Sequence, residues 1–370
     1  MPAIYCGNIL RKNVLVIIKV LVVMCPCLMF WTWFTTGPKR IAVEPFFVLP
    51  STSENAWHAL PDLSSLDWPE PPCAPLPTGR QYPNGTFYPL PKAFEPVMSC
   101  GQRNLSKRLL KLFSKVMFKN RLGDRFMLNG GTLVGSFQHH DIVPWDDDVD
   151  VLVDIRVRDT VRKLLKALGP DYRLATNPQH DKLYTRLVRN NSLVQLDIEL
   201  SRHSSRYNWG WPYLDIGYFI SNHTHIWDVA NEKESQKRLL KDLIFPLMFR
   251  PLGLDWYPSP YNTLGYIRQV YGKSGGCAVF GYSHVNEGAG PWGYTSCWSL
   301  GKRYAFVNHR LQMPSQGVIR ESKWRDLFTV GEEQLQFRTR TGPRTVHSLI
   351  MPTLLNMSDV NMYSFVDREA

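Results

Sequence analysis

The sequence predicts a mixed α/β or α+β fold for its larger part, and three observations support this prediction. From about residue 101 onward, short apolar runs typical of strands alternate with segments of helical periodicity. Of the 370 residues, 44% are apolar, which is enough for a packed core and excludes a wholly disordered chain. No repeat with a period of 20–50 residues is present, which argues against a solenoid or propeller.

The predicted elements follow from the spacing of apolar residues. One helix is expected where Leu105, Leu109, Phe113 and Val116 recur at helical spacing, and a second ends at Gly169-Pro170. A strand from residue 126 runs into a glycine pair and turns into a helix near Thr132. Further strands are expected at 149–153, 193–200, 212–219 and 334–341.

The N-terminal region predicts a membrane anchor. Residues 13–36 contain an apolar run from Val14 to Phe34, long enough to span a bilayer as a helix. Arg11 and Lys12 precede this run, which favours a cytoplasmic tail of residues 1–12. The alternative is a cleaved signal peptide, although the apolar run is long for one and no A-x-A site follows. In both cases the remainder of the chain enters the secretory lumen, in the Golgi or the ER.

Residues 37–100 resemble an extended stem, because 13 of the 27 prolines lie there. A lumenal location agrees with five glycosylation sequons, at Asn84, Asn104, Asn190, Asn222 and Asn356. Cys73, Cys100, Cys277 and Cys297 form an even set outside the apolar run. Proximity favours the pairs Cys73–Cys100 and Cys277–Cys297. A zinc site from Cys277, His284 and Cys297 remains an alternative.

An acidic cluster is the most informative feature. Asp146, Asp147, Asp148 and Asp150 fall within five positions, followed by apolar residues of a strand. Because side chains alternate along a strand, Asp148 and Asp150 share one face. Two carboxylates on one face repel each other unless a cation lies between them, and oxygen ligands of this kind suit Mg²⁺ or Mn²⁺. An Asp-rich turn before a strand is the alternative interpretation.

A glycine turn precedes this strand. Gly135 and Ser136 offer backbone amides and a hydroxyl to a phosphate group, and a helix N-terminus adds positive potential. One element could then hold the phosphates of a nucleotide while the next holds the metal. This combination is typical of phosphoryl or nucleotidyl transfer. The net charge of +11 agrees with an anionic partner, whether nucleotide, lipid or nucleic acid.

The stretch from Gly131-Thr-Leu-Val-Gly-Ser to Ile142-Val-Pro-Trp-Asp-Asp-Asp-Val-Asp resembles the LicD family of the nucleotidyltransferase superfamily, which includes fukutin-like proteins. The resemblance continues to about residue 310. It implies a nucleotidyltransferase-like mixed sheet with flanking helices over 101–370, preceded by the membrane helix and the stem, with a β-rich extension from about residue 278. Such folds add a third carboxylate from a neighbouring strand. The resemblance favours Asp215 over Asp197 as that ligand.

These observations predict a metal-dependent transferase in the secretory pathway. Asp148, Asp150 and Asp215 would be the catalytic, metal-binding residues, while Gly135, Ser136 and Arg186 would contact the donor phosphates. The resemblance implies a CDP-linked donor, a phosphorylated alcohol or sugar-alcohol such as phosphoribitol or phosphocholine as cargo, and a glycan or glycoprotein acceptor. The alternative is a catalytically inactive glycan-binding or assembly partner of the same fold. The anchor, stem and sequons argue against a nucleic-acid partner.

Overall fold

The computed structural model describes residues 40–41, 57–58, 60–82, 84–187, 200–231, 238–272, 276–311, 328–354, 360–361, 363 and 366–367. The chain consists of two units, Met1–Arg40 and Ile41–Ala370. Strand β1 (Arg40–Ile41) spans the boundary between them in the sequence, and every other described element belongs to the second unit. The predicted anchor at 13–36 and residues 193–199 of the predicted strand at 193–200 lie outside the described residues. Among the described residues, no helix is long and apolar enough to cross a membrane.

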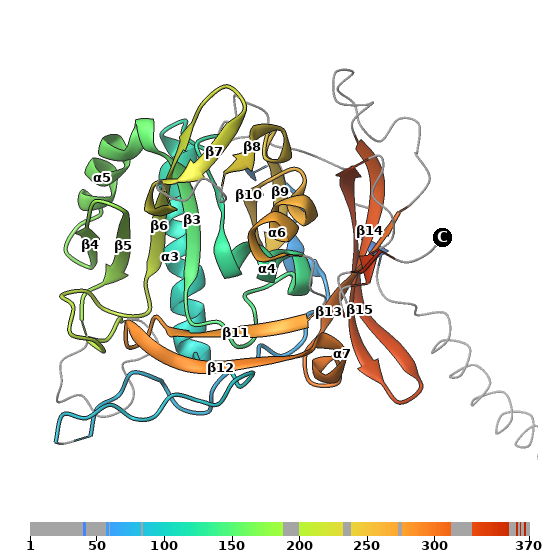
Figure 1. Ribbon diagram of the computed structural model, residues 1–370, viewed down its shortest axis with the longest axis horizontal. Helices are drawn as coiled ribbons and strands as arrows, with labels where there is room; N and C mark the ends of the chain where they lie inside the picture. Colours follow the sequence, from blue (N-terminus) through green and yellow to red (C-terminus); the bar gives the residue numbers. More distant parts are fainter. Residues whose placement is uncertain are drawn as a thin grey trace, which may run out of the picture. The chain divides into compact units, whose positions relative to one another are not determined.

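A seven-stranded mixed sheet forms the centre of the second unit (Figure 1). Five strands follow the order β2-β3-β6-β5-β4, and β7 and β8 extend the sheet from β6. Strands β3 and β6 are parallel, and the other pairs are antiparallel. The strands are β2 (Phe126–Leu128), β3 (Val149–Asp154), β4 (Tyr172–Thr176), β5 (His180–Thr185), β6 (Leu214–Ser221), β7 (His225–Asp228) and β8 (Leu239–Leu240). The prediction of a mixed α/β fold with a multistranded mixed sheet is therefore confirmed.

Few helices accompany this sheet. They are α3 (Cys100–Lys119), α4 (Gly130–His139), α5 (Arg158–Lys166), α6 (Thr263–Tyr271) and α7 (Cys297–Leu300), with short 3₁₀ turns η1 (Leu63–Ser65), η2 (Ile155–Val157), η4 (Val229–Asn231) and η6 (Lys241–Leu243). Helix α3 starts with a capping box, in which Ser99 and Gln102 satisfy each other's backbone amides. Its predicted apolar face, including Leu109 and Phe113, is buried against β3 and β6.

The remaining strands form two hairpins and a C-terminal sheet. The hairpins are β9 (Met248–Leu252) with β10 (Asp255–Ser259), and β11 (Gly276–Ser283) with β12 (Gly288–Ser296). The C-terminal sheet contains, in spatial order, β15 (Gly342–Leu354), β14 (Phe328–Thr339), β13 (Phe306–Leu311), β16 (Val360–Asn361) and β17 (Val366–Asp367). The expected strand at 334–341 is found as part of β14, which ends at Thr339.

The predicted stem does not extend as a spacer over its whole length. Trp57, Leu63, Leu66 and Met98 are buried in the main hydrophobic core. The indole of Trp57 stacks on Phe118 of α3, with ring centroids 4.9 Å apart. Proline-rich composition disfavours long helices and strands but does not prevent irregular chain from covering apolar surface, so residues 57–100 belong to the folded unit.

Both predicted disulfides are present. Cys73 is bonded to Cys100 and Cys277 to Cys297. The first ties the proline-rich segment to the start of α3. The second closes the open end of the β11–β12 hairpin. The alternative zinc site is therefore wrong, because both of its cysteines are oxidised to a disulfide.

A buried charge cluster attaches the C-terminal sheet to the rest of the unit. The guanidinium of Arg250 on β9 donates two hydrogen bonds of 2.8 Å to the carboxylate of Glu333 on β14. His140, which ends α4, lies 2.8 Å from the same carboxylate, and His309 on β13 lies 3.2 Å from it. All four side chains are buried. Burial opposes the charge of Glu333, but Arg250 and His309 hold its pKa well below the usual value.

The burial of His139 should make the stability of the folded protein depend on pH. Burial lowers the pKa of this imidazole to about 4, and only its Nδ1 has a partner, the carbonyl oxygen of Ala305 at 2.7 Å. Unfolded histidine binds a proton near pH 6.5, so this contribution to stability is complete above pH 6.5 and is lost as the pH falls toward 4. Between pH 7 and pH 5 we expect His139 alone to remove about 2 kcal/mol.

Urea unfolding of the wild-type protein and of His139→Phe at both pH values measures this loss. Phenylalanine keeps the ring contacts with Trp145 and Phe306 but binds no proton. The variant should therefore lose less stability on acidification than the wild type. An equal loss in both proteins would show that another group causes it.

Candidate active site

Three carboxylates converge at one end of the parallel pair β3–β6. Asp150 on β3 lies directly opposite Asp215 on β6 in the strand register. Asp148 precedes Asp150 by two positions and so faces the same side. One carboxylate oxygen from each of these residues lies within 4.8 Å of the other two. The structure thus brings together the three predicted metal ligands, whereas Asp197 lies outside the described residues.

The electrostatics of this cluster fit a cation. Burial, followed by the negative charges of Asp148 and Asp215, raises the pKa of Asp150 well above its usual value. Burial and the neighbouring Asp147 and Asp215 raise the pKa of Asp148 to about 6, against the opposing effect of His284. The Oδ1 atom of Asp215 is buried without a hydrogen-bond partner. Clustered oxygen ligands with an unpaired buried oxygen suit Mg²⁺ or Mn²⁺.

Helix α4 begins against these carboxylates. Gly130 has φ +54°, and a Cβ atom there would lie 2.5 Å from Oδ2 of Asp150. A Cβ atom on Gly131 would lie 2.1 Å from Oδ2 of Asp146. Only glycine permits this close approach. No side chain caps the helix N-terminus, which therefore presents backbone amides and positive potential beside the acidic cluster.

Gly135 and Ser136, which the sequence predicts to contact the donor phosphates, do not lie at the start of α4 beside the acidic cluster. Both lie inside α4, one turn beyond its start. The hydroxyl of the buried Ser136 donates a 2.8 Å hydrogen bond to the carbonyl of Pro251. A Cβ on Gly135 would lie 2.4 Å from the carbonyl oxygen of Asp141, so this glycine allows the following loop to pack on the helix. The glycine pair at the helix start, Gly130-Gly131, faces the cluster in their place.

Arg186 is also separate from the carboxylates. It lies just after the end of β5, four positions beyond Lys182, which is about 13 Å along a strand. Its exposed guanidinium is 3.7 Å from the exposed carboxylate of Asp171. A basic side chain that does contact the cluster is Lys182, whose Nζ lies 2.8 Å from Oδ2 of Asp215.

Lys182 belongs to a second, buried network. Its ammonium lies 3.5 Å from Oε1 of Glu287 and 3.8 Å from the ring centroid of Tyr213. Burial opposes the charge, but Asp215 and Glu287 raise the pKa of Lys182. Glu287, in the turn between β11 and β12, also accepts hydrogen bonds from Trp209, Tyr213 and Tyr282. Its backbone has φ +49°, an uncommon conformation for a residue other than glycine. The sequence contained no local signal for this network.

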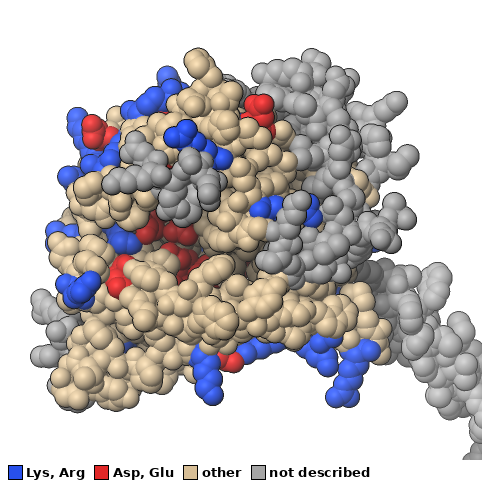
Figure 2. Space-filling view, viewed as in Figure 1, with Lys and Arg blue, Asp and Glu red and all other residues tan. Residues whose placement is uncertain are grey.

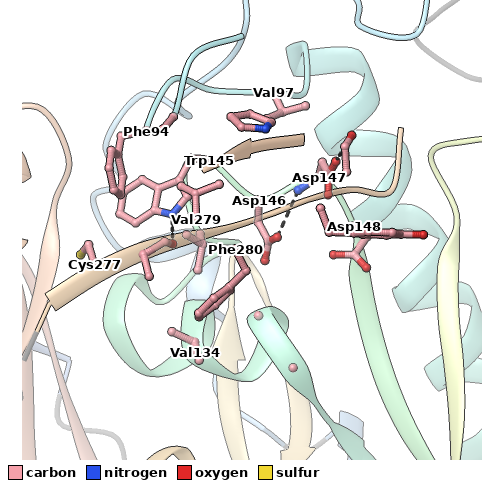
Figure 3. Close-up of a pocket in the computed structure, with 18 of the residues that line it drawn as sticks. Phe94, Val97, Val134, Trp145, Asp146, Asp147, Asp148, Cys277, Val279 and Phe280 are labelled. Carbon is pink, nitrogen blue, oxygen red and sulfur yellow. Dashed lines mark hydrogen bonds between the residues drawn. The ribbon is translucent and has the colours of Figure 1, made fainter. Parts of the chain in front are cut away.

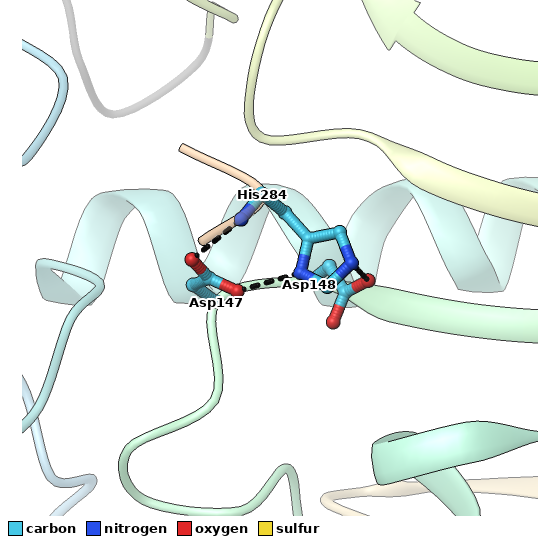
Figure 4. A group of neighbouring side chains, drawn as sticks. All are labelled: Asp147, Asp148 and His284. Atoms are coloured by element: carbon cyan, nitrogen blue, oxygen red, sulfur yellow. Dashed lines mark hydrogen bonds and ion pairs between the residues drawn. The ribbon is translucent and has the colours of Figure 1, made fainter. Parts of the chain in front are cut away.

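Asp147 has a different role from its neighbours. Its carboxylate accepts hydrogen bonds of 2.9 Å from the Ser283 hydroxyl and the His284 backbone amide. The imidazole of His284 bridges two aspartates, with Nδ1 2.9 Å from Asp147 and Nε2 3.2 Å from Asp148 (Figure 4). Burial opposes the charge of His284, but Asp148 and Asp147 raise its pKa well above the usual value. Asp147 therefore fixes the β11–β12 hairpin beside the carboxylates.

A pocket of about 410 Å³ opens over the cluster. Figure 2 shows acidic side chains gathered at the bottom of a hollow. Asp146, Asp148 and Asp150 line one side together with the start of α4. The other side is aromatic, with Trp145 beside Phe94 and with Phe280 reaching from β11 toward α4 (Figure 3). The pocket therefore joins an acidic surface to an aromatic one.

Residues 123–262 match the family model described as LicD/FKTN/FKRP, nucleotidyltransferase domain. These residues form a LicD-family domain. The chain is also 27% identical over 179 residues to the ribitol-5-phosphate transferase FKTN of Macaca fascicularis, and 26% identical over 179 residues to that of Homo sapiens. Each alignment covers 46% of this chain and 33% of the relative, so the chain spans about a third of the length of the curated relatives it matches.

The LicD-family domain and the sequence that follows it both contribute residues to the carboxylate cluster and its surroundings. The matched residues include Asp148, Asp150, Asp215 and Lys182. His284 and Glu287 lie on the β11–β12 hairpin, beyond the matched range. The predicted resemblance to the LicD family is confirmed for residues 123–262. The β11–β12 hairpin, which the family match does not cover, places His284 beside the carboxylates of this domain.

Proposed function

We propose that this protein is a metal-dependent transferase that moves a phosphorylated alcohol or sugar-alcohol from a CDP-linked donor to a glycan. The observation that carries the proposal is the convergence of Asp148, Asp150 and Asp215 within 4.8 Å beside the uncapped start of α4. The name of the FKTN relatives favours phosphoribitol as the transferred group, and phosphocholine is the alternative within the family.

Each part of the pocket has a role in this proposal. The three carboxylates hold Mg²⁺ or Mn²⁺, which neutralises charge on the donor phosphates when bound. The backbone amides at the start of α4 bind the same diphosphate. The acceptor oxygen bonds to phosphorus as the phosphoanhydride bond to CMP breaks, and a carboxylate accepts the acceptor's proton. Lys182 holds Asp215, so we assign the proton to Asp146, which lines the pocket outside the triad.

The alternative, a catalytically inactive partner with the same fold, would tolerate loss of the acidic set. The complete triad and the unpaired oxygen of Asp215 favour the enzyme. Burying carboxylates that repel one another costs free energy, and an inactive binding protein would not need them.

A donor panel tests the proposal. The full-length protein with Mn²⁺ should bind CDP-linked ribitol or choline more tightly than UDP- and GDP-linked sugars, and EDTA should abolish binding. Contacts of the diphosphate with the metal and with the amides of α4 explain why a nucleoside diphosphate binds. The expected preference for cytosine comes only from the resemblance to the LicD family. Equal binding of all three nucleotides would remove the CDP assignment and leave a metal-dependent transferase. Binding that EDTA does not change would contradict the metal site.

We also propose a single-pass protein of the Golgi or ER membrane with residues 101–370 in the lumen. Support comes from the apolar run at 13–36 and from three sequon asparagines, Asn84, Asn104 and Asn222, which are exposed. Asn190 and Asn356 lie outside the described residues. Endoglycosidase treatment of the protein expressed in cells should increase its gel mobility. Absence of that shift, together with cleavage of the folded region by protease added outside intact microsomes, would exclude this topology.

A further inference from the structure

The β11–β12 hairpin carries an exposed aromatic strip, defined here as Phe280, Trp292 and Tyr294. Their exposed fractions are 72%, 75% and 58%, the three largest of any large hydrophobic side chain among the described residues. A run of exposed aromatic rings on one element is uncommon unless the surface binds something.

The strand register places the three rings on one face. Phe280 pairs directly with Trp292, and Tyr294 lies two positions further along β12, opposite Ala278. A Cβ atom on Gly276 would lie 2.2 Å from the ring of Tyr294, so this ring lies flat across the neighbouring strand. Phe280 also stacks on Tyr271 of α6, with ring centroids 6.0 Å apart, but the small residues Gly276 and Ala278 leave most of the strip's surface exposed.

The opposite face of the hairpin is packed against the protein. Cys277 is buried in a cluster with Trp145, and Val279 packs against the same cluster. A Cβ atom on Gly293 would lie 2.8 Å from the side chain of Ala93. One face therefore holds the hairpin in place, and the aromatic strip is not needed for that attachment.

The hairpin is held rigidly relative to the carboxylates. The Cys277–Cys297 disulfide closes its open end, and Asp147 binds the backbone and side chain of His284 near its turn. Glu287 in the turn binds Tyr213, which directly precedes β6, the strand that carries Asp215. The strip thus has a defined position at the pocket, and two of its members, Phe280 and Tyr294, line the pocket itself.

We infer that the aromatic strip binds a neutral sugar ring of the acceptor glycan and directs its hydroxyl toward the carboxylates. This inference rests on the proposed function, because it assigns the second substrate of the same site. An aromatic face offers a flat apolar surface that fits the C–H face of a sugar ring, and the hydroxyl of Tyr294 at the pocket offers a hydrogen-bond partner.

Other occupants fit the sequence of the hairpin less well. Residues 276–296 contain no lysine or arginine, whereas surfaces that bind anionic lipid or nucleic acid carry several. Continuity with the pocket favours a substrate over a second protein chain, because an occupant of the strip also reaches the space above the carboxylates.

Binding of the full-length protein to an array of neutral oligosaccharides built from hexose and N-acetylhexosamine tests the inference. Trp292 is the residue to replace, because it is not among the residues that line the pocket. We expect Trp292→Ala to weaken binding about fivefold to tenfold, and Trp292→Tyr to keep most of it. The thermal midpoint should stay unchanged because the ring is 75% exposed. Leu254→Ala, at 54% exposure on the β9–β10 turn, is the matched control and should bind like the wild type.

A second measurement separates this inference from the proposed function. Metal-dependent hydrolysis of a CDP-linked donor, in which water replaces the acceptor as nucleophile and CMP leaves, reports the carboxylates without the acceptor, and Trp292→Ala should leave its rate within about twofold of the wild type. If the wild-type protein binds glycans but releases no CMP, the result contradicts the proposed donor site and leaves the inference about the aromatic strip intact. Oligosaccharide binding unchanged in Trp292→Ala would overturn the inference. A strip that instead controls self-association in gel filtration, or binding to phosphatidylcholine vesicles, would overturn it as well.

Discussion

Replacing Asp150 by asparagine should reduce the rate of transfer by about 10³-fold or more. A bound metal ion supplies several kcal/mol of charge stabilisation in the transition state, and about 4 kcal/mol corresponds to three orders of magnitude. Asparagine keeps the shape of the side chain but removes the charge that attracts the cation. Asp150 lies opposite Asp215 and belongs to the triad with Asp148, so its loss removes one of the three carboxylates that converge there.

The same substitution should not unfold the protein. Burial and the charges of Asp148 and Asp215 already disfavour the ionised form of Asp150, so a neutral side chain relieves repulsion when metal is removed. We expect the thermal midpoint in EDTA to equal or exceed that of the wild type, and the stabilisation by Mn²⁺ to disappear. Asp171→Asn, which alters an exposed aspartate, is the control and should keep wild-type turnover. Full turnover of Asp150→Asn would disprove the metal assignment.

Replacing Arg250 by methionine should lower the free energy of unfolding by about 3–5 kcal/mol. Removing one partner of a buried ion pair leaves an uncompensated charge in the interior. Here the carboxylate of Glu333 would keep only His140 and His309 as partners. The double variant Arg250→Met/Glu333→Met should recover much of the loss, because it removes both charges.

Urea denaturation measures this effect, and the chain offers a matched control. Arg303 pairs with Glu95 in an exposed bidentate ion pair, so Arg303→Met should cost less than about 1 kcal/mol. Equal costs for the two variants would show that the buried cluster does not stabilise the attachment of the C-terminal sheet. The cluster joins β9, α4, β13 and β14, which the sequence shows only as separate elements.

Local features of the sequence were enough to predict the central elements of the LicD-family domain. The apolar spacing from Leu105 to Val116 predicts α3, and the period of two in Asp148-x-Asp150 places both carboxylates on one face of β3. The two disulfides followed from proximity in the chain. Each of these conclusions depends on residues fewer than about 30 positions apart, where the geometry of helices, strands and short loops limits the arrangements.

Contacts between distant residues were decided only by the tertiary structure. Asp215 becomes the third carboxylate because β6 lies parallel to β3 in one particular register. Asp147 binds a hairpin more than 130 residues away, and the proline-rich segment covers the core in place of extending as a spacer. Gly130 and Gly131, and not Gly135 and Ser136, face the carboxylates because α4 starts earlier than the glycine turn suggested. The sequence alone determined which side chains share a face of a strand, which neighbouring carboxylates repel each other and which nearby cysteines form disulfides. Which distant surfaces bury one another depends on the packing of the whole core, which no local pattern encodes.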